Sequence, residues 1–144
     1  MKLFLDSSVL LPVFLAEHPH HAPSLRLYTQ CNPDIACCAS HSLAEVYSTL
    51  TRLPLPHRAT PDQAIGFLES IHRRFGLVSP DGDDYLASIR EAAANRISGG
   101  AIYDALIAGC AIKAGADQIF TWNTRHYLSL GAEVSERVKS PVPD

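Results

Sequence analysis

The sequence lacks any apolar stretch long enough to cross a membrane. Its longest apolar runs, residues 7–16 and 105–112, are far shorter than a transmembrane helix of roughly 20 residues. A secretory signal is also a poor interpretation of its start. Asp6 and Pro12 interrupt the apolar stretch, and no small-residue cleavage site precedes Glu17. We therefore expect no membrane partner.

Cysteine is scarce, and its spacing does not suit cross-linking. The chain has 4 cysteines and no C-x-x-C pair, which excludes the usual pattern of a cysteine-rich zinc site. Cys37 and Cys38 are adjacent, so on a strand their side chains point to opposite faces. A disulfide scaffold is not expected, and a reduced cytoplasmic protein fits best.

Excess positive charge is absent too. The chain has 12 Lys and Arg against 15 Asp and Glu, a net charge of −3. A strongly cationic nucleic-acid surface is thereby excluded, but nucleic acid is not, because a bound cation can reverse the sign of a local field. The sequence also has no P-loop, G-x-G-x-x-G or G-x-S-x-G motif. His18, His20 and His21 do not have the spacing of a helical zinc pair.

What the sequence does contain predicts one α/β domain spanning residues 1–144, with a tail from about 139. Its length suits a single domain, and 47% hydrophobic residues are enough for a core. Strands and helices are expected to alternate, which indicates a mainly parallel sheet of about five strands covered by helices on both faces. The expected strands are residues 2–5, 34–39, 76–79, 117–122 and, at one edge, 132–135.

Six longer helices are expected between these strands, and some have recognisable ends. Thr60-Pro61-Asp62-Gln63 has the pattern of a capping box, and so does Ser42-Leu43-Ala44-Glu45. Gly115 is placed to end the preceding helix in a left-handed conformation. The expected helices are residues 7–16, 23–31, 42 onward, 60–74, 83–95 and 101–114.

Two polar residues follow predicted strands, where parallel sheets bind ligands. Asp6 ends the first strand and Asn123 follows the fourth. The carboxyl ends of parallel strands line the ligand crevice, so both side chains are candidates for a site. Asp6 could equally be an ordinary helix N-cap, and Asn123 could be an ordinary turn residue.

Two further carboxylates lie on predicted helices. Asp104 is the only charged residue between Arg96 and Lys113, on a helix that is apolar nearly all round. Burial of an unpaired carboxylate there would cost several kcal/mol, so a paired or metal-bound role is favoured over a first-turn helix residue. Glu45 has a simple structural explanation, because it completes the capping box with Ser42.

Together, Asp6, Glu45, Asp104 and Asn123 suggest an oxygen-ligand site. Carboxylate and amide oxygens suit Mg²⁺ or Mn²⁺. Such ions promote phosphodiester hydrolysis by activating water and neutralising the developing charge.

The four candidate residues lie in four short segments of the sequence. These are Lys2-Leu3-Phe4-Leu5-Asp6-Ser7-Ser8, Ser42-Leu43-Ala44-Glu45-Val46, Ile102-Tyr103-Asp104-Ala105-Leu106-Ile107-Ala108 and Phe120-Thr121-Trp122-Asn123-Thr124-Arg125-His126-Tyr127. The segments resemble the motifs of PIN domains, and their order and size look most like the VapC-type toxins of toxin–antitoxin pairs. Any one segment is a weak match, whereas four in order over nearly the whole chain are fairly specific.

This resemblance implies a three-layer α/β/α sandwich and a Mg²⁺- or Mn²⁺-dependent endoribonuclease. It also implies a homodimer and a small antitoxin that blocks the site. It carries metal or catalytic roles onto Asp6, Glu45 and Asp104. Asn123 stands where the family often has Asp, and this loss of one charge makes a one-metal resting site plausible.

Three further residues are expected to support these four. Ser8 stands where the family frequently has Asn, and either Ser8 or Thr121 is expected to support the polar ring. Arg125 lies near Asn123 in the sequence, so contact with an RNA phosphate is a hypothesis from that proximity.

Two alternatives remain open at this point. An aspartyl phosphotransferase with Asp6 as nucleophile would require a second Asp two residues later, where this chain has Ser8. A module of this fold that binds RNA or a partner protein without cutting RNA is consistent with Asn123 and with the negative net charge.

Overall fold

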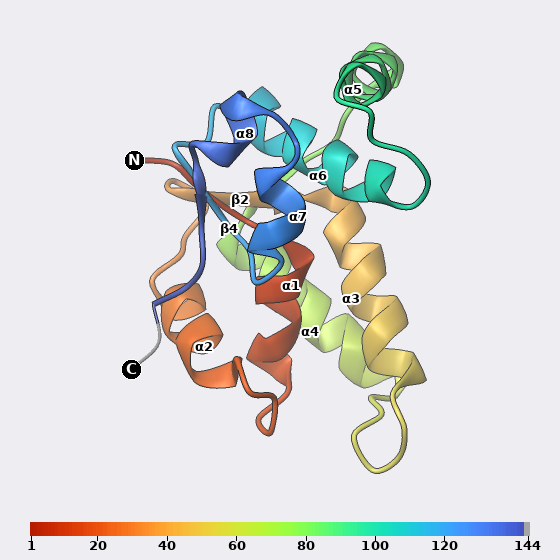
Figure 1. The fold of residues 1–144 in the computed structure, drawn as a ribbon. Helices are drawn as coiled ribbons and strands as arrows, with labels where there is room; N and C mark the ends of the chain where they lie inside the picture. The colour runs from red at the N-terminus through yellow and green to blue at the C-terminus, as the bar shows by residue number, and fades with distance from the viewer. Residues whose placement is uncertain (143–144) are drawn as a thin grey trace.

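The computed structural model describes residues 1–142, in which strands and helices alternate along the chain (Figure 1). The strands are β1 (Leu3–Leu5), β2 (Ala36–Ala39), β3 (Gly76–Val78), β4 (Gln118–Phe120) and β5 (Val138–Lys139). The helices are α1 (Ser7–Leu10), the 3₁₀ helix η1 (Leu11–Phe14), α2 (His21–Thr29), α3 (Ser40–Arg52), α4 (Pro61–Arg74), α5 (Gly82–Ala94), α6 (Ala101–Lys113), α7 (Thr124–Leu128) and α8 (Ala132–Ser135).

The sheet has five strands in the order β3-β2-β1-β4-β5, and every neighbouring pair is parallel. From β1 the chain first builds β2 and β3 on one side, then returns to add β4 and β5 on the other. The order therefore reverses between β1 and β4, which is where open parallel sheets form a ligand crevice. Asp6 and Asn123 follow these two strands.

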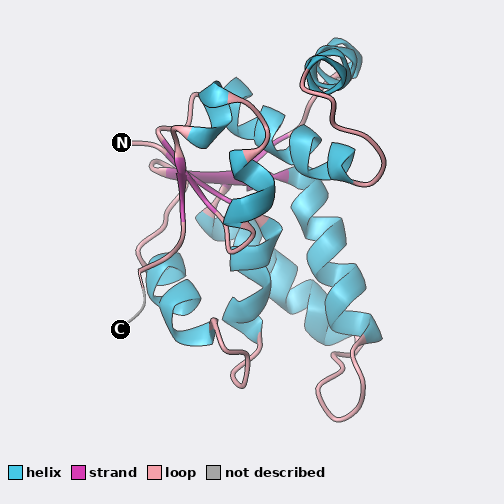
Figure 2. Ribbon diagram, viewed as in Figure 1, coloured by secondary structure: helices cyan, strands magenta, loops and turns pink. Residues whose placement is uncertain are grey.

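Helices cover both faces of the sheet (Figure 2). Alternate residues of each strand point to opposite faces, so Leu5 and Cys38 belong to one core cluster while Phe4 and Cys37 belong to the other. Helices α1 to α4 cover the first face and α6 to α8 the second, with α5 packed outside α6. The expected three-layer sandwich and the expected opposite orientation of the two cysteines are confirmed.

The edge of the sheet differs from the prediction. Residues 132–135 form one helical turn, α8, and the edge strand is β5. Gly131 has a φ of 101° and changes the direction of the chain, and the following turn buries Val134 in the core. Four residues with one buried position do not distinguish a helical from a strand period. Lys139 therefore belongs to the sheet, although the tail was expected to start there, and tail residues 143–144 lie outside the described residues.

The helix ends show which capping predictions were right. Thr60 and Gln63 form the predicted reciprocal pair, with backbone-to-side-chain distances of 3.1 and 2.9 Å. Gly115 has a φ of 69° directly after α6, as predicted. Helix α3, however, begins at Ser40 instead of Ser42, and no side chain caps it. The Ser42–Glu45 capping box does not form, because Ser42 is fully buried within the helix.

The expected helix over residues 7–16 is divided. Its α-helical part ends at Leu10 and continues as η1, which contains Pro12 in its first turn. Proline has no N–H and is tolerated at that position of a helix. None of the helices in residues 1–142 is long and apolar enough to span a bilayer.

Candidate active site

Asp6 lies at the crevice end of β1. Its backbone N–H donates to the carbonyl of Phe120 at 2.9 Å, which ties the end of β1 to the end of β4. The side chain is only 3% exposed and serves as the N-cap of α1, where Oδ2 accepts from Ser8 N at 3.4 Å. Asp6 is therefore a helix N-cap, as one of its two interpretations predicted. Its carboxylate also lies at the point where the strand order of the sheet reverses.

Three hydroxyl groups surround the Asp6 carboxylate. Tyr127 Oη donates to Oδ1 at 2.8 Å. Ser8 Oγ and Thr121 Oγ1 donate to Oδ2 at 2.8 and 2.9 Å. An ionised carboxylate can only accept hydrogen bonds, so a shell of donors suits its charged form and fixes its orientation. The backbone N–H groups of Trp122 and Asn123 donate in turn to Ser8 Oγ and Thr121 Oγ1.

Glu45 reaches the same crevice from α3. Its Oε1 accepts a hydrogen bond from Ser7 Oγ at 2.8 Å, and Ser7 Oγ also lies 2.8 Å from Ser42 Oγ. The Ser42 and Glu45 side chains therefore meet Ser7 of α1 in place of capping their own helix. This contact connects two elements that are far apart in the sequence and holds Glu45 half-buried.

Asp104 is less buried than its apolar helix predicts. Its side chain is 29% exposed in the first turn of α6, and the buried residues of this helix start one turn later, at Ile107. Partial burial raises the pKa of Asp104, and the negative charge of Asp6 raises it further. His126 Nδ1, 3.3 Å from Asp104 Oδ2, acts in the opposite direction. Asp104 and Asp6 are thus coupled like charges.

One open cavity of about 160 Å³ joins the predicted residues. Asp6, Glu45, Asp104 and Asn123 all line it, together with Ser8. The other lining residues are Ser7, Leu11, Val46 and Thr49. Thr121 does not line the cavity and lies behind Asp6, whereas Arg125 lies exposed on α7 outside the cavity lining.

The donor set fits a hard divalent cation by its chemistry. Carboxylate and amide oxygens converge on one open space, where burial and the negative charge of Asp6 raise the pKa of Asp104, and a nearby cation would oppose this rise. Within residues 1–142, no three His, Cys, Asp or Glu side chains form a ready-made metal cluster. Mg²⁺ commonly binds through one or two carboxylates and keeps several waters, so two carboxylates such as Asp6 and Asp104 would be enough.

Comparison with known proteins agrees with the family resemblance of the sequence. The family model described as PIN domain matches residues 3–128. The chain belongs to the PIN domain family. Ribonuclease VapC40 of Mycobacterium tuberculosis strain H37Rv is 35% identical over 137 residues, which cover 95% of this chain and 94% of that protein.

Solved structures show the same fold at lower identity to this PIN domain. The crystal structure of Mycobacterium tuberculosis VapC20, a Sarcin-Ricin loop cleaving toxin, has a TM-score of 0.66 at 17% identity and covers 82% of this chain and 87% of that one. VapBC2 from Rickettsia felis, bound to a DNA fragment from their promoter, has a TM-score of 0.65 at 17% identity, covering 97% and 98%.

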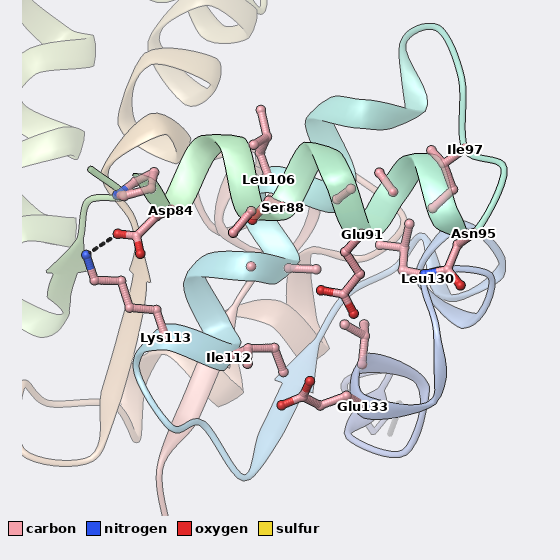
Figure 3. Close-up of a pocket in the computed structure, with 17 residues that line it drawn as sticks. Asp84, Ser88, Glu91, Asn95, Ile97, Leu106, Ile112, Lys113, Leu130 and Glu133 are labelled. Atoms are coloured by element: carbon pink, nitrogen blue, oxygen red, sulfur yellow. Dashed lines mark hydrogen bonds and ion pairs between the residues drawn. The ribbon is translucent and has the colours of Figure 1, made fainter. Parts of the chain in front are cut away.

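A second cavity of the PIN domain lies apart from these carboxylates. It measures about 230 Å³ and lies between α5 and α6, with α8 at one end (Figure 3). Its Asp84 is paired with Lys113 at 2.5 Å, so that negative charge is already neutralised. None of the four candidate residues lines it. The cavity lined by Asp6, Glu45, Asp104 and Asn123, here called the acidic cavity, is therefore the better candidate for chemistry.

Sequence analysis missed two side chains that hold the PIN site together. Ser7 and Tyr127 were each named only as part of a motif. Tyr127 lies four residues after Asn123, a spacing that places both on one face of a helix, and this was its one available signal. Ser7 had none, because its contacts with Ser42 and Glu45 exist only in the folded chain.

Proposed function

We propose that this PIN domain is a metal-dependent endoribonuclease that hydrolyses RNA phosphodiester bonds. The observation that carries the proposal is the convergence of Asp6, Glu45, Asp104 and Asn123 on one open cavity at the switch point of the sheet. A relative that covers almost the whole chain bears the name ribonuclease, which supports the same activity.

The three carboxylates would have different tasks. Asp6 and Asp104 would hold Mg²⁺ or Mn²⁺ directly. Glu45 would ligate directly or through water and orient the attacking water, with Ser7 fixing its carboxylate. When bound, the cation supplies an activated water and neutralises charge that develops on the phosphate.

Other residues would complete the site around them. Asn123 would add a neutral oxygen ligand to the polar ring, while Ser8 and Thr121 keep Asp6 in place. Arg125, exposed on α7, would contact a phosphate of the RNA. Without a cation the three carboxylates repel the RNA backbone, so the proposal requires a divalent ion for binding as well as for chemistry.

The cellular role that we propose is that of a toxin in a VapBC-type toxin–antitoxin pair. A small antitoxin would block the acidic cavity, and the active form would be a homodimer in the cytoplasm. The fold shared with VapC20 and with Rickettsia VapBC2 supports this assignment. A gene for a small DNA-binding protein beside this one would add support.

The direct test is cleavage of a structured RNA pool by purified, partner-free protein. Reactions contain Mg²⁺, Mn²⁺ or EDTA, and each is repeated with Asp6→Ala and Asp104→Ala. Cuts that need a divalent ion and disappear in both variants are expected. Full activity in both variants would refute the site assignment.

A PIN-like module that binds RNA or a partner protein without cutting is the competing function. Asn123 in place of an acidic residue favours it, because one negative charge is missing from the ring. It predicts RNA binding with no cleavage at any concentration of divalent ion.

A further inference from the structure

Tyr127 is an unusual member of a short surface helix. Helix α7 has five residues, of which Arg125, His126 and Leu128 are exposed. Tyr127 is 0% exposed and belongs to the core cluster that contains Phe4 and Ile119. Its ring fills an apolar space in which a phenylalanine would serve equally well. The hydroxyl group therefore requires a separate explanation.

The hydroxyl of Tyr127 has one partner, and that partner is the Asp6 carboxylate. Among residues 1–142, Tyr127 provides the side-chain hydrogen bond to Oδ1, at 2.8 Å, while Ser8 and Thr121 donate to Oδ2. The two oxygens of the carboxylate are thus held by different donors. Removal of the Tyr127 hydroxyl leaves the carboxylate anchored through Oδ2 alone, so the position of Oδ1 is less tightly fixed.

The environment keeps this hydroxyl a donor. Burial raises the pKa of Tyr127 well above its ordinary value, and the charge of Asp6 raises it further. The phenol O–H lies 2.8 Å from an oxygen of the Asp6 carboxylate, which can only accept. The hydrogen bond is therefore charge-assisted, the stronger class of hydrogen bond.

We propose that Tyr127 is a positioning residue that fixes the Asp6 carboxylate in the orientation that a divalent cation requires. This inference rests on the proposed function, because it presumes that Asp6 is a metal ligand. Groups that orient metal ligands commonly contribute 10- to 100-fold to metal affinity. Tyr127 lies on α7, which Asn123 immediately precedes. The hydrogen bond between Tyr127 and Asp6 therefore also aligns the β4–α7 segment with the start of α1.

The chain offers a matched control for the hydroxyl. Tyr28 is also buried, at 4% exposure, and belongs to the core cluster on the opposite face of the sheet. Its Oη lies 2.5 Å from Ser70 Oγ. Tyr28→Phe and Tyr127→Phe each remove one buried, hydrogen-bonded hydroxyl. Only the second removes a contact with Asp6.

The test is isothermal titration of Mn²⁺ into metal-free protein in the absence of RNA. The dissociation constant is expected to rise about 10-fold in Tyr127→Phe and to stay unchanged in Tyr28→Phe. Urea unfolding confirms that both variants are folded. Equal affinity of Tyr127→Phe and wild type would overturn the positioning role alone. Wild type that binds no Mn²⁺ would overturn the proposed metal-dependent function together with it.

A second measurement covers the case in which Tyr127→Phe does not fold. In wild-type protein with isotope-labelled tyrosine rings, addition of Mg²⁺ is expected to shift the Tyr127 resonance and to leave that of Tyr28 in place. A Tyr127 resonance that does not respond while Mg²⁺ binds would overturn the proposal.

Discussion

Asp104 carries a charge that the metal-free protein accommodates poorly. Its folded-state pKa is raised by partial burial and by Asp6. A raised pKa means that the folded protein binds this proton more tightly than the unfolded chain does. The bound proton therefore stabilises the folded state fully below the unfolded pKa of about 3.9. This stabilisation is lost as the pH rises through the folded-state pKa.

This sign predicts the behaviour of Asp104→Asn. Without metal, wild type is expected to lose stability relative to Asp104→Asn as the pH rises from acid to neutral, because only wild type gains the negative charge. Urea unfolding across this range measures the difference. Asp62→Asn, at an exposed position of α4, is the control and should show no such gain. A difference in stability that does not change with pH would contradict the raised pKa of Asp104.

Replacement of Thr121 is expected to lower the stability of the protein. It is 0% exposed, donates to Asp6 Oδ2 and accepts from the Asn123 backbone N–H. Thr121→Val leaves both partners short of a hydrogen bond and should lower the free energy of unfolding by about 1–3 kcal/mol. The control is Thr51→Val, because the Thr51 hydroxyl donates only to two carbonyl groups of its own helix. An equally large loss of stability in Thr51→Val would contradict the role of the Thr121 hydrogen bonds.

Individual residues could be predicted from the sequence where a local rule applied. Asp6 and Asn123 follow strands, and Asp104 is the one charge on an apolar helix. Glu45 was assigned a capping partner because Ser42 stands at the right spacing, but both side chains turn to Ser7, 35 or more positions away. The Tyr127–Asp6 contact spans 121 positions, and nothing local encodes it.

Local signals predicted helix ends correctly at Thr60 and at Gly115, although they misplaced the start of α3. Gly115 follows α6 with a φ of 69°, and the N–H groups of Gly115 and Ala116 donate to Ile112 and Ala111 at 3.0 Å each. These two bonds form a Schellman motif, which needs the left-handed conformation at Gly115. Gly66, in contrast, lies exposed inside α4, and a Cβ there would meet nothing within 4 Å.

The same substitution should therefore have opposite effects at the two sites. Gly115→Ala is expected to lower the free energy of unfolding by about 1–2 kcal/mol, because alanine resists the left-handed conformation. Gly66→Ala is expected to raise it by about 0.5–1 kcal/mol, because alanine favours helix. Thermal or urea unfolding of both variants checks the pair. Effects of one sign at both sites would contradict the backbone argument.

The sequence did not specify helix α8. Residues 132–135 are too few to show a period, and their helical turn depends on Gly131 and on burial of Val134. The alternation of strands and helices, in contrast, repeats along the whole chain and predicted the layers correctly. The order of strands in the sheet was not predictable, because it depends on contacts between distant segments.

At the scale of the whole molecule, stability depends on a core without cross-links. All four cysteines are buried free thiols. Burial raises the pKa of Cys31 to about 11 and that of Cys38 to about 12. A thiol-specific reagent near pH 8 is therefore expected to modify these two cysteines on the order of 100-fold more slowly in native protein than in urea. Rapid modification of native protein would contradict the tight packing of the sheet.

The layers of the molecule explain why the site is where it is. Asp6 stands between β1 and α1, Glu45 lies on α3 on one face of the sheet, and Asp104 lies on α6 on the other face (Figure 1). The three carboxylates meet where the strand order reverses, and we propose that RNA is cut there.

The most direct test is the rate of cleavage of one RNA substrate in Mg²⁺ by wild type, Glu45→Gln and the matched control Glu69→Gln. Glu69 lies exposed on α4 and does not line the cavity. Glu45→Gln is expected to slow cleavage by at least about 100-fold, because a carboxylate that orients attacking water is lost, whereas Glu69→Gln is expected to cleave like wild type. Equal rates for all three proteins would contradict the assignment of the active site.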